Sequence, residues 1–127
     1  MAKSQRLNSN EEKKLIKRVL ETNNLEYTNG RISGVFNDEI LFDYQLDNLC
    51  IKHFSFKGKN LRRVISSARQ WSFAAGEVEG VKKVLFIYDS DFEDKDNLKI
   101  IINILSKHAK VLQMDEGMDY ILQSCVV

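Results

Sequence analysis

The sequence predicts a single α/β domain over residues 1–127, with a mixed sheet and the element order α-β-β-β-α-β-α-β-α. Two kinds of pattern support this prediction. Several segments carry apolar residues at helical spacing. Between them lie an alternating apolar and polar run, Ile40–Leu46, and a continuous apolar run, Val84–Tyr88, which are typical of strands buried on one face and on both faces. Helices that alternate with such strands indicate an α/β architecture.

Composition and charge limit the class of protein. A chain of 127 residues, of which 43% are hydrophobic and 29% charged, is long enough to bury a core and ordinary for a soluble globular protein. It has no apolar run long enough to span a bilayer and no apolar signal segment at its start, so we expect a cytoplasmic protein without membrane contact. Residues 1–9 are expected to be flexible. The net charge of +1 excludes a global attraction to nucleic acid, so such affinity must come from local clusters.

The cysteines and histidines predict neither a disulfide scaffold nor a zinc site. Cys50 and Cys125 are too few and too far apart for such a scaffold, and no paired cysteine motif accompanies His53 and His108. We expect free thiols, with Cys50 acting as a small buried apolar residue. His53 is expected to be packed rather than catalytic, although the titration range of histidine keeps catalysis open.

The first helix is expected from about Asn10 to Asn23. Ser9 followed three residues later by Glu12 forms a capping box, and we expect Glu12 to serve as the capping residue of this helix rather than as a catalytic acid. A stripe at helical spacing follows: Leu15, Ile16, Val19 and Leu20. A short strand, Arg31–Phe36, is expected next.

The segment from Asp38 to Lys59 predicts a β-hairpin around which the rest of the chain packs. A two-residue turn at Asp47-Asn48 sets the register. The register pairs Leu46 with Leu49, Gln45 with Cys50, Tyr44 with Ile51, Asp43 with Lys52, and Phe42 with His53. One face then holds Ile40, Phe42, Tyr44, Leu46, Leu49 and Ile51, and the other holds Glu39, Asp43, Gln45, Cys50 and Lys52.

The second half of the chain predicts helices that alternate with buried strands. A second helix begins near Leu61 and is expected to stop at Gly76. After the strand Val84–Tyr88, a third helix is expected from about Asp94 to His108, with acidic residues before it and basic residues at its end. A short strand, Val111–Met114, follows. The last segment fits a helix from Asp115, although its closing Val126-Val127 fits a strand equally well.

The order α-β-β-β-α-β, with an Asp on the second strand and a Lys on the third, resembles the PD-(D/E)XK superfamily of restriction-endonuclease-like nucleases. Asp43 in LFDYQLD and Lys52 in LCIKHFSFKGKN carry the resemblance, which covers roughly residues 10 to 90. Some nuclease domains of bacterial contact-dependent toxins look similar here. The resemblance implies a restriction-endonuclease-like fold and a Mg²⁺-dependent phosphodiesterase activity.

The chemistry of that family needs Mg²⁺ held by carboxylates, which polarises a phosphate oxygen and helps to activate water beside a lysine. The resemblance therefore assigns catalysis to Asp43 and Lys52 and the metal to Asp43 and Glu39, with Glu12 as a further candidate acid. Cys50 departs from the pattern, because the family has an acid at that position and a thiol is a poor Mg²⁺ ligand. The alternative for Asp43 and Lys52 is a cross-strand ion pair on a solvated face.

A basic cluster surrounds the start of the second helix, where Arg62 and Arg69 lie two turns apart on one face, with Ser66 nearby. This spacing predicts contacts to successive phosphates. The predicted nucleic-acid-binding residues are Lys57, Lys59, Arg62, Arg69 and Gln70. A solvated face of an amphipathic helix is the other interpretation.

Together these patterns predict a metal-dependent nuclease, or a degenerate nuclease-like protein that still binds DNA or RNA. The alternative from another class is a small protein-binding module, such as an inhibitor or an immunity protein, without catalysis. The acidic segment Asp89–Asp96 can hold a cation at the end of a strand, although compensation of a helix dipole is the plainer account.

Overall fold

The computed structural model describes residues 9–28, 31–34, 39–56, 59–89 and 94–125. These residues form four helices and two sheets. In chain order the elements are α1 (Ser9–Thr22), β1 (Arg31–Ser33), β2 (Glu39–Leu41), β3 (Tyr44–Gln45), β4 (Leu49–Phe54), α2 (Leu61–Val78), β5 (Lys83–Tyr88), α3 (Lys95–Leu105), β6 (Lys110–Gln113) and α4 (Met114–Cys125). The predicted mixed α/β class is confirmed.

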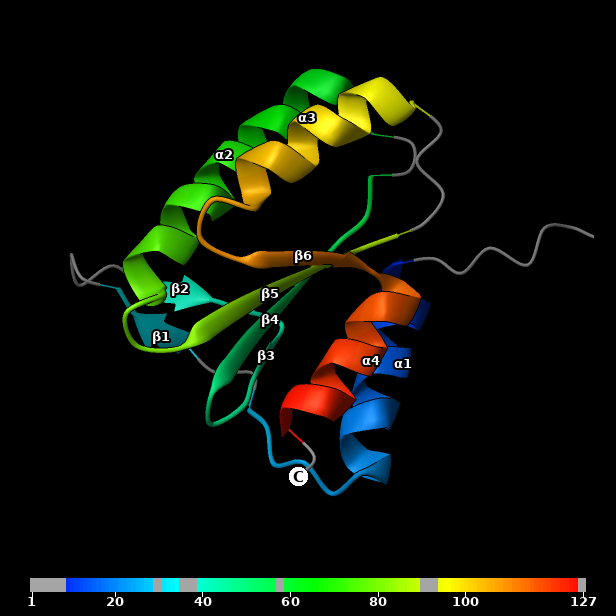
Figure 1. Ribbon diagram of the computed structural model, residues 1–127, viewed down its shortest axis with the longest axis vertical. Helices are drawn as coiled ribbons and strands as arrows, with labels where there is room; N and C mark the ends of the chain where they lie inside the picture. The colour runs from blue at the N-terminus through cyan, green and yellow to red at the C-terminus, as the bar shows by residue number, and fades with distance from the viewer. Residues whose placement is uncertain (1–8, 29–30, 35–38, 57–58, 90–93, 126–127) are drawn as a thin grey trace, which may run out of the picture.

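The larger sheet has the strand order β3-β4-β5-β6. β3 is antiparallel to β4, whereas β4, β5 and β6 are parallel. Helices α2 and α3 form the two crossovers between the parallel strands and lie on one face of the sheet, and α1 and α4 lie on the other face (Figure 1). The smaller sheet is the antiparallel pair β1-β2. The result is a three-layer arrangement in which the parallel strands are covered on both faces.

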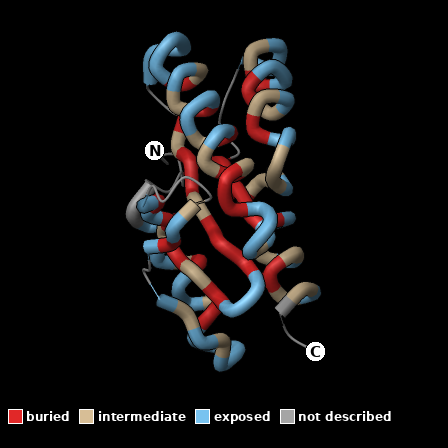
Figure 2. The backbone as a smooth tube through the Cα atoms, turned by 90° about the vertical axis from the view of Figure 1, so that its left-hand side faces the viewer, coloured by how far each residue is buried: buried red, intermediate tan, exposed pale blue. Residues whose placement is uncertain are grey.

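Each face of the larger sheet has its own hydrophobic core. The core under α2 and α3 includes Phe42, Phe54 and Phe86, whereas the core under α1 and α4 includes Ile16, Ile51 and Ile87. The strand β5 contributes alternate side chains to both cores, and Figure 2 shows buried backbone running through the centre of the molecule. The prediction that Val84–Tyr88 is buried on both faces is therefore confirmed.

The predicted hairpin register is confirmed in its inner half. Tyr44 pairs with Ile51 and Gln45 pairs with Cys50. Across the Asp47-Asn48 turn, the N–H of Leu46 donates a hydrogen bond of 2.8 Å to the carbonyl oxygen of Leu49. A two-residue turn thus fixes the pairing, as the sequence indicates.

The outer half of the hairpin differs from the prediction of one strand and one apolar face. β2 ends at Leu41 and pairs with β1 in the smaller sheet, and β3 begins only at Tyr44. Ile40 and Phe42 consequently belong to the core under α2, whereas Tyr44 and Leu46 belong to the core under α1. The predicted order with three strands before α2 is wrong for this reason. An alternating pattern has the same appearance whether or not the chain changes sheet within it.

The helix boundaries agree with the expectations to within one residue except at the C-terminal ends of α2 and α3. Helix α2 continues through Gly76 to Val78, so Gly76 is not a stop signal. A Cβ atom at this position would lie 3.0 Å from Cδ2 of His108, and the glycine thus permits a close approach between α2 and the segment after α3. Asp94 caps α3 by accepting a hydrogen bond from the N–H of Asn97, and the helix ends at Leu105, before His108. The last segment is the helix α4, and residues 126–127 lie outside the described residues.

Candidate functional site at the edge of the larger sheet

Asp43 lies directly before the edge strand β3, where the backbone and the side chain are both anchored to β4. Its N–H donates a hydrogen bond of 3.0 Å to the carbonyl oxygen of Ile51. Its Oδ2 atom accepts a hydrogen bond of 2.7 Å from the N–H of His53. The carboxylate is therefore held in one position at the edge of the sheet.

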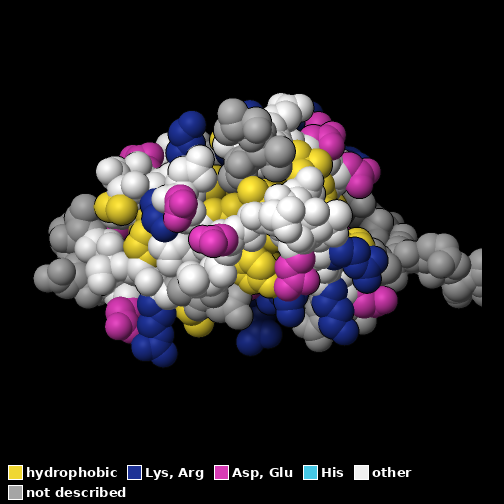
Figure 3. Space-filling view, turned by 90° about the horizontal axis from the view of Figure 1, so that it is seen from below, with side chains coloured by type: hydrophobic (Ala, Val, Ile, Leu, Met, Phe, Trp, Pro, Cys, Tyr) yellow, Lys and Arg dark blue, Asp and Glu magenta, His cyan; other side chains and the backbone are white. Residues whose placement is uncertain are grey.

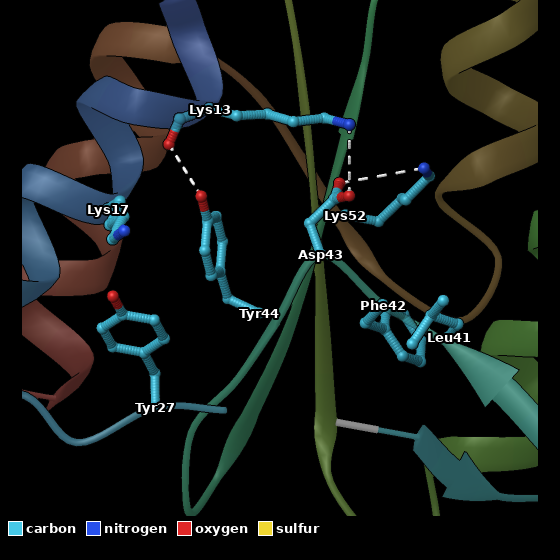
Figure 4. A pocket seen from close by; sticks show the side chains of 8 residues that line it. All are labelled: Lys13, Lys17, Tyr27, Leu41, Phe42, Asp43, Tyr44 and Lys52. Carbon is cyan, nitrogen blue, oxygen red and sulfur yellow. Dashed lines mark hydrogen bonds and ion pairs between the residues drawn. The ribbon is translucent and has the colours of Figure 1, made fainter. Parts of the chain in front are cut away.

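Two lysines reach this carboxylate from different elements. Nζ of Lys52, on β4, lies 3.8 Å from Oδ2 of Asp43, and Nζ of Lys13, on α1, lies 3.4 Å from Oδ1 (Figure 4). The predicted proximity of Asp43 and Lys52 is confirmed. Only 16% of the Asp43 side chain and 21% of the Lys52 side chain are exposed, so this pair is more enclosed than the ion pair on a solvated face that the sequence also allowed.

Aromatic rings enclose the ammonium group of Lys52. Nζ lies 5.0 Å from the centre of the Trp71 ring and 5.8 Å from that of Phe54, both within the range of a cation–π contact. Burial lowers the pKa of Lys52, and the charge of Asp43 opposes this shift. Lys52 is thus a partly desolvated cation that is fixed between a carboxylate and two rings.

A cavity of about 500 Å³ opens beside Asp43. Its lining residues come from α1, β3, β4 and the segments beside them: Lys13, Lys17, Tyr27, Leu41, Phe42, Asp43, Tyr44 and Lys52. The hydroxyl of Tyr44 donates a hydrogen bond of 2.9 Å to the carbonyl oxygen of Lys13, which fixes α1 against the sheet. Burial raises the pKa of Tyr44, so this hydroxyl remains a donor. We call this space the Asp43 cavity.

Lys13, Lys17 and Tyr27 were not among the candidates from the sequence. Lys13 and Lys17 are four residues apart, so they lie on one face of α1 beside its apolar stripe. This spacing is the one sequence pattern that places the two lysines together, but it does not indicate a site, because charged residues beside an apolar stripe are usual on any amphipathic helix. The side chain of Tyr27 packs edge-on against Tyr44, with ring centres 5.4 Å apart, and a single tyrosine in a turn carries no sequence signal for this contact.

Glu12 and His53 form a buried pair next to this cavity. Nε2 of His53 lies 2.7 Å from Oε1 of Glu12, and both residues are buried. The capping interpretation of Glu12 did not include this contact, whereas the expectation of a packed His53 is confirmed. Burial lowers the pKa of His53 to about 4, with the charges of Lys13, Lys52 and Lys59 acting in the same direction and Asp43 opposing them. The ring of His53 is therefore neutral near pH 7.

The residues around the Asp43 cavity are a poor fit to Mg²⁺. Glu39 lies on β2, where its carboxylate pairs with Arg31 at 3.1 Å, and it does not line this cavity. Among the lining residues that the structure describes, Asp43 is the one carboxylate, and each of its oxygens already faces a lysine. In the described ranges, no group of three or more His, Cys, Asp or Glu residues is arranged to hold a metal ion. Hard divalent cations favour several oxygen ligands.

Cys50 is fully buried and belongs to the core under α2. Burial raises the pKa of this thiol to about 11, so it remains protonated near pH 7. The expectation that Cys50 is a free, buried apolar residue is confirmed. A protonated thiol in a hydrophobic core is neither a metal ligand nor a nucleophile.

The predicted nucleic-acid-binding residues separate into two places. Arg62, Arg69 and Gln70 line one hollow on the outer side of α2 together with Ser66, which confirms that they share a face. Lys59 lines a different cavity, at the end of β4. Lys57 lies outside the described residues. Figure 3 views the molecule from below, away from α2, and on that face acidic and basic side chains are interspersed, so a charged ligand there would meet local clusters rather than a broad basic surface.

No family model matches this chain, and neither a curated protein nor a solved structure matches it significantly. None of the helices in the described part of the chain has the length and apolar character needed to cross a membrane.

Proposed function

We propose that this protein binds nucleic acid through the Asp43 cavity and that it is a degenerate relative of the restriction-endonuclease-like nucleases, with slow or absent cleavage. The observation that carries the proposal is the charge of the cavity. The described lining residues include three lysines, Lys13, Lys17 and Lys52, and one carboxylate, Asp43, so two positive charges remain in excess among them. An open cationic cavity of this kind favours a polyanion over a cation.

The neighbouring groups suit a phosphodiester strand. Lys17 is exposed and has no ion-pair partner among the described residues, so its ammonium group can neutralise a phosphate. The ring of Tyr27 lies at the same cavity and offers a surface on which a base can stack. Arg62, Arg69 and Gln70 on α2 would extend the contact beyond the cavity. A bound strand would release counterions, which makes the affinity strongly dependent on salt.

The proposed family relation rests on two residues. Asp43 and Lys52 lie 3.8 Å apart between helix α1 and helix α2, as the resemblance implies, although four strands rather than three precede α2 and two of them, β1 and β2, form a separate sheet. Asp43 with Glu39 would be the metal-holding pair by resemblance, but Glu39 pairs with Arg31. We therefore favour binding over Mg²⁺-dependent hydrolysis.

The first prediction concerns binding. Fluorescence anisotropy with labelled single-stranded and double-stranded DNA and RNA should show binding that weakens steeply with salt. Lys17→Gln combined with Lys52→Gln should lower the affinity about tenfold or more and reduce the slope of log K against log salt by about 1 to 2, since each lost phosphate contact contributes about 0.7 to 0.9. Lys99→Gln, on the exposed side of α3, is the control for loss of a positive charge and should change neither quantity.

Two results would contradict the proposal. Cleavage that requires Mg²⁺ or Mn²⁺ and is lost in Asp43→Asn would show an active nuclease in place of a degenerate one. Absence of binding to any DNA or RNA at low salt would instead favour the protein-binding module. Leu41 and Phe73 have 57% and 61% of their surface exposed, which provides apolar contacts for a protein partner.

A further inference from the structure

A second basic cavity, of about 300 Å³, lies at the end of β4 beside the start of α2. Its lining residues are Phe54, Ser55, Phe56, Lys59, Arg63, Val64 and Ser67. Of the described residues, none lines both this cavity and the Asp43 cavity. The ring of Phe54 lies between the two, since Lys52 of the Asp43 cavity lies over that ring at 5.8 Å from its centre. We call this second space the β4-end cavity.

The polar side of the β4-end cavity carries two positive charges. Lys59 and Arg63 are exposed, and neither has an ion-pair partner among the described residues. Ser67 lies four residues beyond Arg63 on the same face of α2, so its hydroxyl adds a third donor. The cavity also lies at the N-terminal end of the 18-residue helix α2, where the helix dipole favours an anion.

The opposite wall is apolar and rigid. Phe54 stacks on Phe56 and Phe56 stacks on Tyr88, each with ring centres 6.0 Å apart. Behind this wall, Oδ2 of the buried Asp89 accepts hydrogen bonds from the Ser55 hydroxyl at 2.9 Å and from the Phe56 N–H at 3.2 Å. The Ser55 hydrogen is thereby engaged, so the donors available to a ligand are those of α2 and Lys59. Asp89 positions the wall.

We propose that the β4-end cavity binds a phosphomonoester whose organic part lies against the apolar wall. A phosphomonoester carries nearly two negative charges near pH 7, which match the charges of Lys59 and Arg63. The planar guanidinium of Arg63 can hold two phosphate oxygens at once, and Lys59 supplies a point charge. The cavity is larger than a bare phosphate needs and lies near the lower end of the range for small-molecule sites. The proposal does not rest on nucleic-acid binding at the Asp43 cavity.

The same chemistry is present in a free nucleotide and at the phosphorylated end of a nucleic-acid strand. Isothermal titration of the full chain should use inorganic phosphate, a nucleoside monophosphate and the unphosphorylated nucleoside. A short oligonucleotide with and without a terminal phosphate completes the series. We expect the nucleoside monophosphate to bind at least tenfold more tightly than the nucleoside. The two oligonucleotides are compared in Lys17→Gln combined with Lys52→Gln, where strand binding at the Asp43 cavity is weakened. There a larger preference for the phosphorylated oligonucleotide would identify the strand end as the ligand, whereas equal binding of both oligonucleotides would identify the free nucleotide.

Matched variants separate this cavity from the Asp43 cavity. Arg63→Gln should weaken binding of the monophosphate at least tenfold, and Ser67→Ala should weaken it several-fold. Arg62→Gln removes a neighbouring charge that does not line the cavity, and Lys17→Gln removes one from the Asp43 cavity, so both should leave monophosphate binding unchanged. Circular dichroism of each variant verifies that it is folded.

The proposal is overturned if the nucleoside binds as tightly as its monophosphate, if Arg63→Gln binds like the unaltered protein, or if no phosphorylated compound binds at millimolar concentration. Loss of oligonucleotide binding in Lys17→Gln with Lys52→Gln, while monophosphate binding persists, would leave this proposal intact. The failure of one proposal is thus distinguishable from the failure of the other.

Discussion

The two faces of the larger sheet differ in what they bury. The face under α2 and α3 is aromatic, and the rings of Phe54, Phe86 and Trp71 contact one another with centres 5.2 to 6.2 Å apart. The face under α1 and α4 is mainly aliphatic but contains the buried contact between Glu12 and His53. The aromatic face packs rings against one another, whereas the aliphatic face places two buried titratable groups in contact with each other.

Strand β4 connects these two environments because its side chains alternate. Lys52 lies on the aromatic face, beside Trp71, and His53 lies on the other face, beside Glu12. Asp43 stands at the edge where both faces meet, since its carboxylate contacts Lys52 and the backbone of His53 as well as Lys13 of α1. A ligand at this edge can therefore contact Lys52 from the aromatic face and Lys13 from α1, beside a carboxylate that the backbone of β4 holds in place.

The largest expected effect is a loss of stability from the aromatic face. Phe86 is fully buried and its ring contacts both Phe54 and Trp71. Phe86→Ala should lower the free energy of unfolding by about 3 to 5 kcal/mol, because the removed ring leaves a cavity that the neighbouring rings cannot fill. Urea denaturation followed by circular dichroism measures this loss.

Phe73→Ala is the matched control, since 61% of Phe73 is exposed. It should change the free energy of unfolding by about 0.5 kcal/mol or less. A loss for Phe86→Ala as small as that of the control would mean that the aromatic face is not the better-packed one.

The sequence predicts the centre of the larger sheet and the hairpin turn well. Every residue of Val84–Tyr88 is apolar, so burial on both faces follows whichever way the strand is turned. The Asp47-Asn48 turn fixes which residues pair, and it places Asp43 near Lys52 without knowledge of the rest of the fold. Patterns within one segment are therefore sufficient to predict strand burial and hairpin pairing, because both depend on residues that are close in the sequence.

The other parts of the site depend on contacts between distant segments. Glu12 and His53 are 41 residues apart, and the capping box at Ser9 offered a complete local explanation for the glutamate. Lys13 reaches Asp43 only because α1 packs on the edge of the sheet. The chain passes from the smaller sheet to the larger sheet after Leu41, and the alternating pattern of apolar residues continues across this point without a break. Each of these features requires the tertiary arrangement, which spacing within one segment does not contain.

The second expected effect concerns pH and the aliphatic face. The pKa of His53 is about 4 in the folded protein, whereas in the unfolded chain it is near the ordinary histidine value of 6.5. As the pH falls from about 6.5 to about 4, the unfolded state binds a proton that the folded state does not, so stability falls. The loss should approach about 3 kcal/mol, because each tenfold difference in proton affinity between the two states corresponds to about 1.4 kcal/mol.

Urea denaturation at several pH values measures this dependence. His53→Gln removes the titrating ring and keeps a polar side chain near Glu12, so it should flatten the curve between pH 6.5 and 4. His108→Gln is the control, because His108 is 40% exposed and pairs with Glu79 on the surface. A curve that is equally steep in His53→Gln would remove His53 as the cause.

The smallest expected effect compares one glycine on each side of the sheet. A Cβ atom at Gly76 of α2 would lie 3.0 Å from Cδ2 of His108, a partly exposed side chain that can turn away. A Cβ atom at Gly117 of α4 would lie 2.8 Å from Cγ1 of Ile87, a fully buried and branched side chain that cannot move without disturbing β5. Alanine gains up to about 1 kcal/mol of helix propensity in a helix interior, and less in the first turn, where Gly117 lies.

Gly76→Ala should therefore be neutral or stabilise the protein by up to about 1 kcal/mol, whereas Gly117→Ala should destabilise it by about 1 kcal/mol, because overpacking costs about 1 to 3 kcal/mol. Urea denaturation of the two variants side by side gives the difference, which should be about 2 kcal/mol. A double variant, Gly117→Ala with Ile87→Val, should lose less stability than the sum of the two single losses, since valine lacks the Ile87 Cδ1 atom, 2.9 Å from the added Cβ, and one of the close contacts is removed. Equal stability of the two single variants would mean that α4 shifts away from Ile87 at little cost. The aliphatic face would then not be tightly packed at Gly117.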